Sequence, residues 1–266
     1  MRKIFLKFSL LAALLPLASC SVKKMRTDNK RSSNDRIWHY SMIDVMRRGI
    51  YEGSHTVKEL KAHGDFGLGT FNHLNGELIA LDGIIYRIPP SGKVEVASGD
   101  LKSPFSSLTF FKADTEKTIS FTGSLEELQE KILPMLITHN LPYAIKVEAK
   151  WSNITVGGAE PVSPSDTTEL ATLMKVRPQY KSQNIKGRMV GYFTPSLLSN
   201  VDLSPFHFHF ISEDKRFAGH LMSGQLKNAE VKIYLNEKSG YDVELLRNSS
   251  RFRQMKFESK GASSTY

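Results

Sequence analysis

The chain of 266 residues has little cysteine, no apolar run long enough to cross a bilayer, and no repeat of fixed period. Its single cysteine, Cys20, cannot form an intrachain disulfide, and this count excludes a Cys-based zinc finger and a four-cysteine cluster. Hydrophobic residues make up 40% and charged residues 24%, which excludes a disordered chain, a collagen-like repeat and a coiled coil. At this length we expect one large domain, or two small lobes that share a core.

The net charge of +9 is carried by the two ends of the chain. Residues 1–36 hold nine Lys and Arg against two Asp, and residues 247–260 hold five against one Glu, which leaves residues 37–246 with a net charge of −2. A nucleic-acid-binding domain needs a basic face on the fold itself, so we expect no nucleic-acid partner. Residues 247–266 are interpreted as a basic C-terminal tail, solvated or near anionic lipid.

The N-terminus has the pattern of a signal peptide of the lipoprotein type over residues 1–19. A short basic region precedes an apolar run over residues 8–17, which is too short to span a bilayer. The run ends in Leu17-Ala18-Ser19-Cys20, which resembles a bacterial lipobox and implies lipidation of Cys20; the alternative is a secretory peptide with an incidental cysteine. We therefore expect a lipid-anchored protein of the bacterial cell envelope, joined to its anchor by a basic tether over residues 20–36. Ser21 in place of Asp predicts the outer membrane if the cell is Gram-negative.

Residues 37–246 are predicted to fold as α+β, with mixed, mostly antiparallel β-sheets in two closely packed lobes and a few short helices. Helix caps are predicted at Ser41, Thr56 and Ser124, where a hydroxyl precedes an acid by three residues. The glycine-rich segment 64–72 predicts turns and close backbone approach. Strands are predicted at 78–81 and 84–88, across an Asp82-Gly83 turn, and at 143–147, 154–156, 186–193 and 206–211.

Residues 206–211 hold the most informative pattern, Phe-His-Phe-His-Phe-Ile. In a strand His207 and His209 share one face and the phenylalanines share the other. A turn centred on Asp214-Lys215 would place His209 opposite His220, so that three imidazoles could reach one ion. Three neutral histidines suit Zn²⁺ and leave its fourth position open, whereas the alternative is a His-X-His pair on a solvated face.

Two long motifs resemble the alpha-acetolactate decarboxylase family. The first runs from His63 to Asn72 and continues into Asn75-Gly76-Glu77; the second runs from Phe206 to Asp214 and continues into Gly219-His220. Shorter matches in the same order are Tyr40–Ile43, Pro104-Phe105, Tyr143–Lys146 and Gly191–Pro195. The resemblance covers residues 38–246.

This resemblance implies the chemistry of the site. It implies that His207, His209 and His220 bind Zn²⁺, and that Glu77 is catalytic. The reaction implied is decarboxylation of 2-acetolactate, a small 2-hydroxy-3-oxo acid, to acetoin and CO₂. Zinc would stabilise the enediolate left after CO₂ departs, and Glu77 would deliver the proton. Thr70 is a candidate to bind substrate through its hydroxyl, and an equal alternative is a hydrogen bond to its own backbone. The family also suggests a homodimer.

Two family features are absent from their expected positions. The arginine that positions the substrate carboxylate falls at Gly157, and no arginine occurs between Arg87 and Arg177. The sequence leaves three explanations: Arg177 or Arg188 substitutes, the substrate lacks that carboxylate, or the protein is a metal-containing small-molecule-binding lipoprotein with lost or altered activity. Glu258 is a loose candidate for the C-terminal glutamate of the family.

Overall fold

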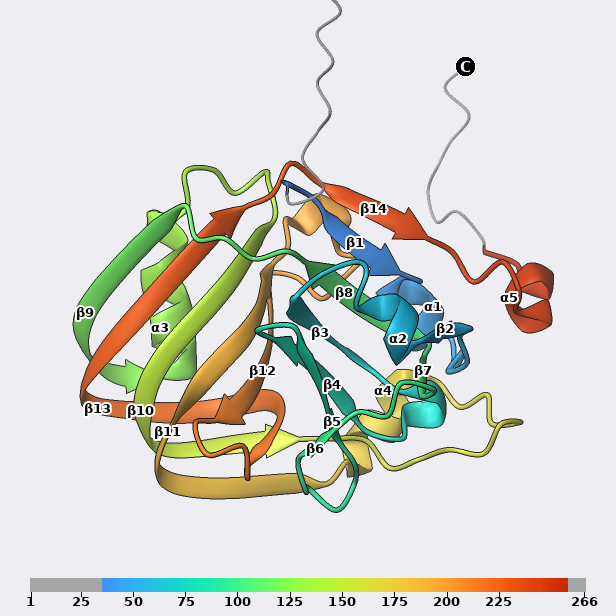
Figure 1. Ribbon diagram of the computed structural model, residues 1–266, viewed down its shortest axis with the longest axis horizontal. Coiled ribbons are helices and arrows are strands. Elements are labelled where there is room, and N and C mark those ends of the chain that lie inside the picture. The colour runs from blue at the N-terminus through green and yellow to red at the C-terminus, as the bar shows by residue number, and fades with distance from the viewer. Residues whose placement is uncertain (1–34, 258–266) are drawn as a thin grey trace, which may run out of the picture. The chain divides into compact units, whose positions relative to one another are not determined.

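The computed structural model describes residues 35–257, and its architecture confirms the predicted fold class (Figure 1). The first sheet has seven short strands in the order β14-β1-β8-β3-β4-β5-β6. All neighbours in it are antiparallel except the parallel pair β1 and β14. Its strands are β1 (Ile37–Tyr40), β3 (Phe66–Thr70), β4 (Glu77–Leu81), β5 (Ile84–Ile88), β6 (Glu95–Val96), β8 (Phe105–Thr109) and β14 (Tyr241–Glu244).

The second sheet has five longer strands, drawn in green to orange in Figure 1. The order is β10-β11-β12-β13-β9, and β10 also pairs with β13, so β10 to β13 close into a ring. The strands are β9 (Thr115–Ser124), β10 (Tyr143–Gly157), β11 (Gln179–Phe193), β12 (Phe206–Ser212) and β13 (Ala218–Glu237). A separate two-stranded sheet pairs β2 (His55–Thr56) with β7 (Lys102–Ser103).

The α-helices are short, and all but α5, which follows β14, lie between strands. They are α1 (Ile43–Arg47), α2 (Val57–Leu60), α3 (Leu125–Ile132), α4 (Leu170–Leu173) and α5 (Ser250–Gln254). Among residues 35–257 none of them has the length and apolar character needed to cross a membrane.

Two of the three predicted helix caps are confirmed. Thr56 and Ser124 each form a complete capping box with the glutamate three residues later. The cap predicted at Ser41 is wrong, because Met42 is the N-cap of α1 and Ser41 has a φ of +69°. The Ser41 hydroxyl is buried and has no hydrogen-bond partner, so it does not cap the first turn.

The glycine-rich segment forms strand β3, so the turns predicted there are wrong, while the close backbone approach is confirmed. A Cβ on Gly67 would lie 2.0 Å from the Ser107 carbonyl oxygen, and one on Gly69 would lie 2.3 Å from that of Phe105. The predicted strand pair across Asp82-Gly83 is confirmed, with positive φ at both turn residues. The two strands predicted at 143–147 and 154–156 are one strand, β10, with a register shift between Ala149 and Asn153.

The two sheets pack against each other through a shared core. Phe66, Leu68 and Ile79 of the first sheet contact Val190 and Ile211 of the second. A second core lies under α3 and holds Phe208 and Phe210. These two phenylalanines therefore lie on one face of β12, as its alternation predicted, and His207 and His209 lie on the other face, which is also buried.

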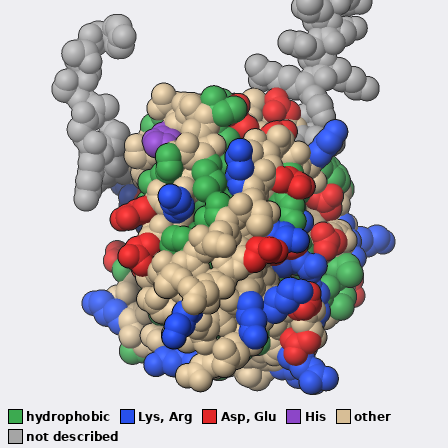
Figure 2. Space-filling view, turned by 90° about the vertical axis from the view of Figure 1, so that its left-hand side faces the viewer, with side chains coloured by type: hydrophobic (Ala, Val, Ile, Leu, Met, Phe, Trp, Pro, Cys, Tyr) green, Lys and Arg blue, Asp and Glu red, His purple; other side chains and the backbone are tan. Residues whose placement is uncertain are grey.

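Charges of both signs are interspersed on the face shown in Figure 2. The segment after β14, which belongs to the predicted basic tail, includes α5, whose Phe252 packs near Tyr40 and Val45. The rest of the predicted tail, with Glu258, and the whole signal peptide, with Cys20, lie outside the described residues.

Candidate active site

Two adjacent strands bring the three predicted metal ligands together. His209 of β12 pairs directly with His220 of β13 across a turn in which Lys215 has a φ of +59°. His207 lies two residues before His209 on the same face of β12. The hairpin register predicted from the sequence is therefore confirmed.

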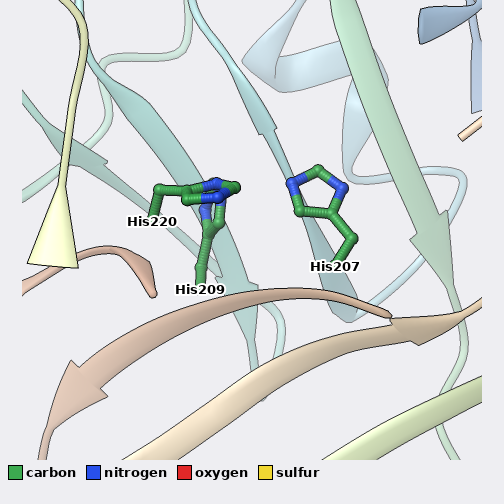
Figure 3. Close-up of side chains that lie close together, drawn as sticks. All are labelled: His207, His209 and His220. Atoms are coloured by element: carbon green, nitrogen blue, oxygen red, sulfur yellow. The ribbon is translucent and has the colours of Figure 1, made fainter. Parts of the chain in front are cut away.

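The three imidazole rings face one another (Figure 3). Their centroids are 5.4 Å apart for His207 and His209, and 5.3 Å apart for each of the pairs with His220. One nitrogen from each ring lies within 4.8 Å of the others, so the group could hold one metal ion.

Hydrogen bonds fix the proton on two of these rings. His207 donates from Nδ1 to Asp202 Oδ1 at 2.9 Å, and His209 donates from Nδ1 to the Leu78 carbonyl oxygen at 2.9 Å. Their Nε2 lone pairs are then available to a metal, which is the arrangement found at zinc sites. Burial lowers the pKa of His209 to about 3 and that of His220 well below its ordinary value, and the neighbouring His207 adds to both shifts. Both rings are thus neutral ligands at neutral pH.

The rings open into a cavity of about 180 Å³. Its wall combines apolar and polar side chains. The apolar side chains are Ile43, Met46, Leu74, Phe105, Ala159, Leu170, Met174 and Leu203. The polar ones are Arg47, Thr70, Glu77, Arg177 and the three histidines. A small acid with a short apolar substituent fits this combination of side chains.

Glu77, the predicted catalytic residue, lies beside the histidines. It is the first residue of β4, its side chain is only 13% exposed, and its Oε2 is 3.6 Å from His209 Nε2. Burial raises the pKa of Glu77 to about 8, and the charge of Arg177 opposes part of that shift. The metal-free site therefore holds a carboxyl group that is mostly protonated at neutral pH.

Thr70, the predicted substrate-binding residue, pairs with Glu77 across β3 and β4. Its hydroxyl donates to the Gly76 carbonyl oxygen at 2.9 Å. The hydroxyl lines the cavity, so it can offer a ligand its lone pairs but not its proton.

Gly157 stands where an arginine was expected, and Arg177 reaches the same cavity from another segment of the chain. Gly157 pairs with His220 at the end of β10, and Arg177 comes from the irregular chain just before β11. Arg177 lines the cavity, whereas Arg188 is ion-paired with Glu148 at 3.1 Å and is not part of the cavity wall. Of the two substitutes that the sequence left open, Arg177 is the one that reaches the site.

Two residues of the site were missed by the sequence reasoning. Asp202, fully buried, accepts the Nδ1 proton of His207, and Arg47 of α1 lines the cavity. Asp202 lies in a loop with no periodicity, so its only sequence signal is an acid five residues before a candidate ligand. Arg47 is indistinguishable in sequence from a solvated helix residue.

Comparisons with known proteins agree with this geometry. The family model for alpha-acetolactate decarboxylase matches residues 37–259. The alpha-acetolactate decarboxylase of Bacillus licheniformis is 34% identical over 199 residues, which cover 75% of this chain and 78% of the relative. That of Methanosarcina mazei is 31% identical over 213 residues, covering 80% of this chain and 74% of the relative.

A solved structure shares the fold as well as the sequence. The crystal structure of alpha-acetolactate decarboxylase from Bacillus subtilis superposes with a TM-score of 0.79 at 29% identity, and covers 83% of this chain and 93% of that one. The match of the family model extends over both sheets and includes the histidine hairpin and Glu77. On this evidence the chain belongs to the alpha-acetolactate decarboxylase family.

Proposed function

We propose that the protein is a zinc-dependent lyase that converts 2-acetolactate to acetoin and CO₂. The observation that carries the proposal is the grouping of three histidines, Glu77 and Arg177 around one small cavity. Imidazole nitrogens suit zinc, and three protein ligands leave a position for substrate. Membership of the family supplies the reaction.

Each polar group has a distinct task in this reaction. A zinc ion on the histidines would act as a Lewis acid towards the adjacent ketone and hydroxyl oxygens of the substrate. Arg177 carries a planar guanidinium that matches a carboxylate, and it would orient the group that leaves as CO₂. Thr70 would accept a hydrogen bond from the substrate hydroxyl.

Glu77 would complete the reaction by proton transfer. When the bond to CO₂ breaks, its electron pair stays on the neighbouring carbon, and one proton must be delivered for acetoin to form. A carboxyl group with a raised pKa can hold that proton at neutral pH and give it up in the water-poor cavity.

The proposed enzyme works in the cell envelope. The lipobox-like end of the signal peptide supports lipidation of Cys20, and residues 20–36 would then serve as the tether. The substrate is a small 2-hydroxy-3-oxo acid, and the family supports a homodimer.

The test is to supply 2-acetolactate to purified protein of known zinc content and measure acetoin. We expect turnover that is lost in His209→Ala together with the bound zinc. Absence of acetoin at full zinc occupancy would refute the decarboxylase and leave the alternative of a metal-containing binding lipoprotein. Turnover that persists after zinc is removed by a chelator would refute the zinc requirement.

A further inference from the structure

A further buried histidine lies behind the proposed metal site. His39 of β1 has no solvent exposure, and its Nε2 is 3.5 Å from Asp202 Oδ2. Asp202 in turn accepts from His207 Nδ1 at 2.9 Å. Three side chains thus form a line from the seven-stranded sheet to a proposed zinc ligand on the five-stranded sheet.

The two ring nitrogens of His39 have different neighbours. His39 Nδ1 is 3.0 Å from the Ser41 carbonyl oxygen, which can only accept, so Nδ1 carries a proton. Nε2 is buried, has no closer polar partner and lies 3.5 Å from Asp202 Oδ2, so this carboxylate oxygen is the polar atom that it faces.

Asp202 is the link between the two histidines. Its Oδ1 accepts from His207 Nδ1 and from the Leu203 backbone nitrogen, and its Oδ2 accepts from the Ser107 hydroxyl at 2.8 Å. Burial alone would raise the pKa of Asp202, but His207 and His39 hold it well below the ordinary range. The carboxylate is therefore charged, and its orientation depends on partners from both sheets.

We propose that His39 is a positioning residue of the metal site, which holds Asp202 so that the carboxylate keeps the His207 Nε2 lone pair directed at the ion. The inference rests on the proposed zinc site. An oriented carboxylate behind a histidine ligand fixes its tautomer and increases its basicity, and loss of such a partner typically weakens metal binding 10- to 100-fold, roughly. The chain supplies not only that carboxylate but also a support for it.

Two substitutions separate this role from simple filling of the core. His39→Asn retains a donor close to the Nδ1 position, where it can keep the bond to Ser41, but it is too short to reach Asp202. His39→Gln extends an amide towards the Nε2 position. We expect zinc affinity, measured by competition with a chromophoric chelator, to fall about 10- to 100-fold in His39→Asn and to stay near the wild-type value in His39→Gln.

A matched control comes from the ring on the other side of His39. Tyr241 packs edge-on against His39 at 5.6 Å, and its hydroxyl bonds to Thr194 at 2.9 Å rather than to Asp202. Tyr241→Phe removes the hydroxyl of a half-buried ring that packs against His39, and should leave zinc affinity unchanged. Equal losses in Tyr241→Phe and His39→Asn would overturn the proposal, because both would then report general loosening of the core.

A double variant tests whether His39 acts through Asp202. In an Asp202→Asn background, the further change His39→Asn should have no additional effect on zinc affinity. Full additivity would overturn the proposal, as would equal zinc affinity of His39→Asn and His39→Gln. Absence of zinc binding by the wild-type protein would instead refute the metal site itself, so the two failures are distinguishable.

Discussion

The guanidinium of Arg177 lies beside the space that a side chain on Gly157 would enter, because a Cβ on Gly157 would be 3.4 Å from Arg177 Nε. Gly157 pairs with His220, so this space adjoins the proposed metal ligands. Among residues 35–257 no carboxylate forms an ion pair with Arg177, and its guanidinium contacts the Met174 sulfur at 3.8 Å. Arg177 therefore reaches the site from a segment other than β10.

Arg177→Gln should reduce kcat/KM for acetolactate about 10- to 100-fold, since a charge-assisted bond to a carboxylate contributes about 1.5–3 kcal/mol. Arg188→Gln is the matched control, because Arg188 pairs with Glu148 away from the cavity, and its activity should equal that of the wild type. A larger loss in Arg188→Gln than in Arg177→Gln would contradict this assignment. Steady-state kinetics of acetoin release distinguish the two outcomes.

The same relationship predicts a rescue. Gly157→Arg combined with Arg177→Gln should recover part of the lost kcat/KM, because the new side chain starts beside the position that Arg177 vacates. The Cβ of residue 157 would lie 2.7 Å from the Met222 sulfur, at the flexible end of a side chain that can shift. If the double variant is no more active than Arg177→Gln, the two positions do not serve one subsite.

Glu77→Gln should reduce kcat about 10²- to 10⁴-fold, the range expected when a positioned acid is lost. Zinc content should stay near the wild-type level, because the amide leaves the three histidines in place. Glu95→Gln is a control on the same sheet, since Glu95 forms an ion pair with Arg87 at 2.8 Å and is not part of the cavity wall. Wild-type turnover in Glu77→Gln would remove Glu77 from the mechanism.

The raised pKa of Glu77 predicts a pH-dependent stability difference in the metal-free protein. Between the ordinary value of 4.5 and about 8, the unfolded carboxyl is ionised while the folded one is protonated, so folding takes up a proton. The free energy of unfolding then falls as pH rises, by up to about 1.4 kcal/mol per pH unit.

Glu77→Gln lacks this loss, so its stability relative to the wild type should increase from pH 5 to pH 8 and level off above that. Urea unfolding of both proteins with chelator present measures the difference. A difference that is constant over this range would show that Glu77 titrates near its ordinary pKa.

Thr70→Val should raise KM about 2- to 10-fold, because a neutral hydrogen bond contributes about 0.5–1.5 kcal/mol. The valine keeps the shape of the threonine but offers no lone pair to a substrate hydroxyl. Thr70→Ser retains the hydroxyl and should stay close to the wild type. An unchanged KM in Thr70→Val would leave the bond to Gly76 as the sole role of the hydroxyl.

The histidine hairpin could be predicted from sequence because it depends on local rules. Strand alternation places His207 and His209 on one face, and a centred turn places His220 opposite His209. Glu77 and Thr70 could be found only through the family motif, because isolated acids and threonines at strand ends are common on solvated surfaces.

Arg177, Asp202 and His39 could not be placed from the sequence, for a different reason. Arg177 and Asp202 lie in irregular segments, and the path of such segments is set by tertiary contacts rather than by local propensity. His39 lies on a regular strand, but its partner is 163 residues away and belongs to the loop before β12. The glycines of β3 led to a wrong prediction of turns, because in the structure they allow neighbouring strands to pack closely.

The lipid anchor is predicted from residues outside the described part of the chain, and its test uses the scarcity of cysteine. Because Cys20 is the single cysteine, a lipid attached to a thiol must be attached there. In a bacterial host, Cys20→Ser should move the protein from the membrane fraction to the soluble fraction and abolish incorporation of labelled fatty acid. Acetoin formation per folded molecule should be unchanged, since the proposed site lies wholly within residues 35–257. Unchanged fractionation of Cys20→Ser, with the variant still processed, would show that residues 1–19 are an ordinary secretory signal and that any membrane association comes from the basic tails.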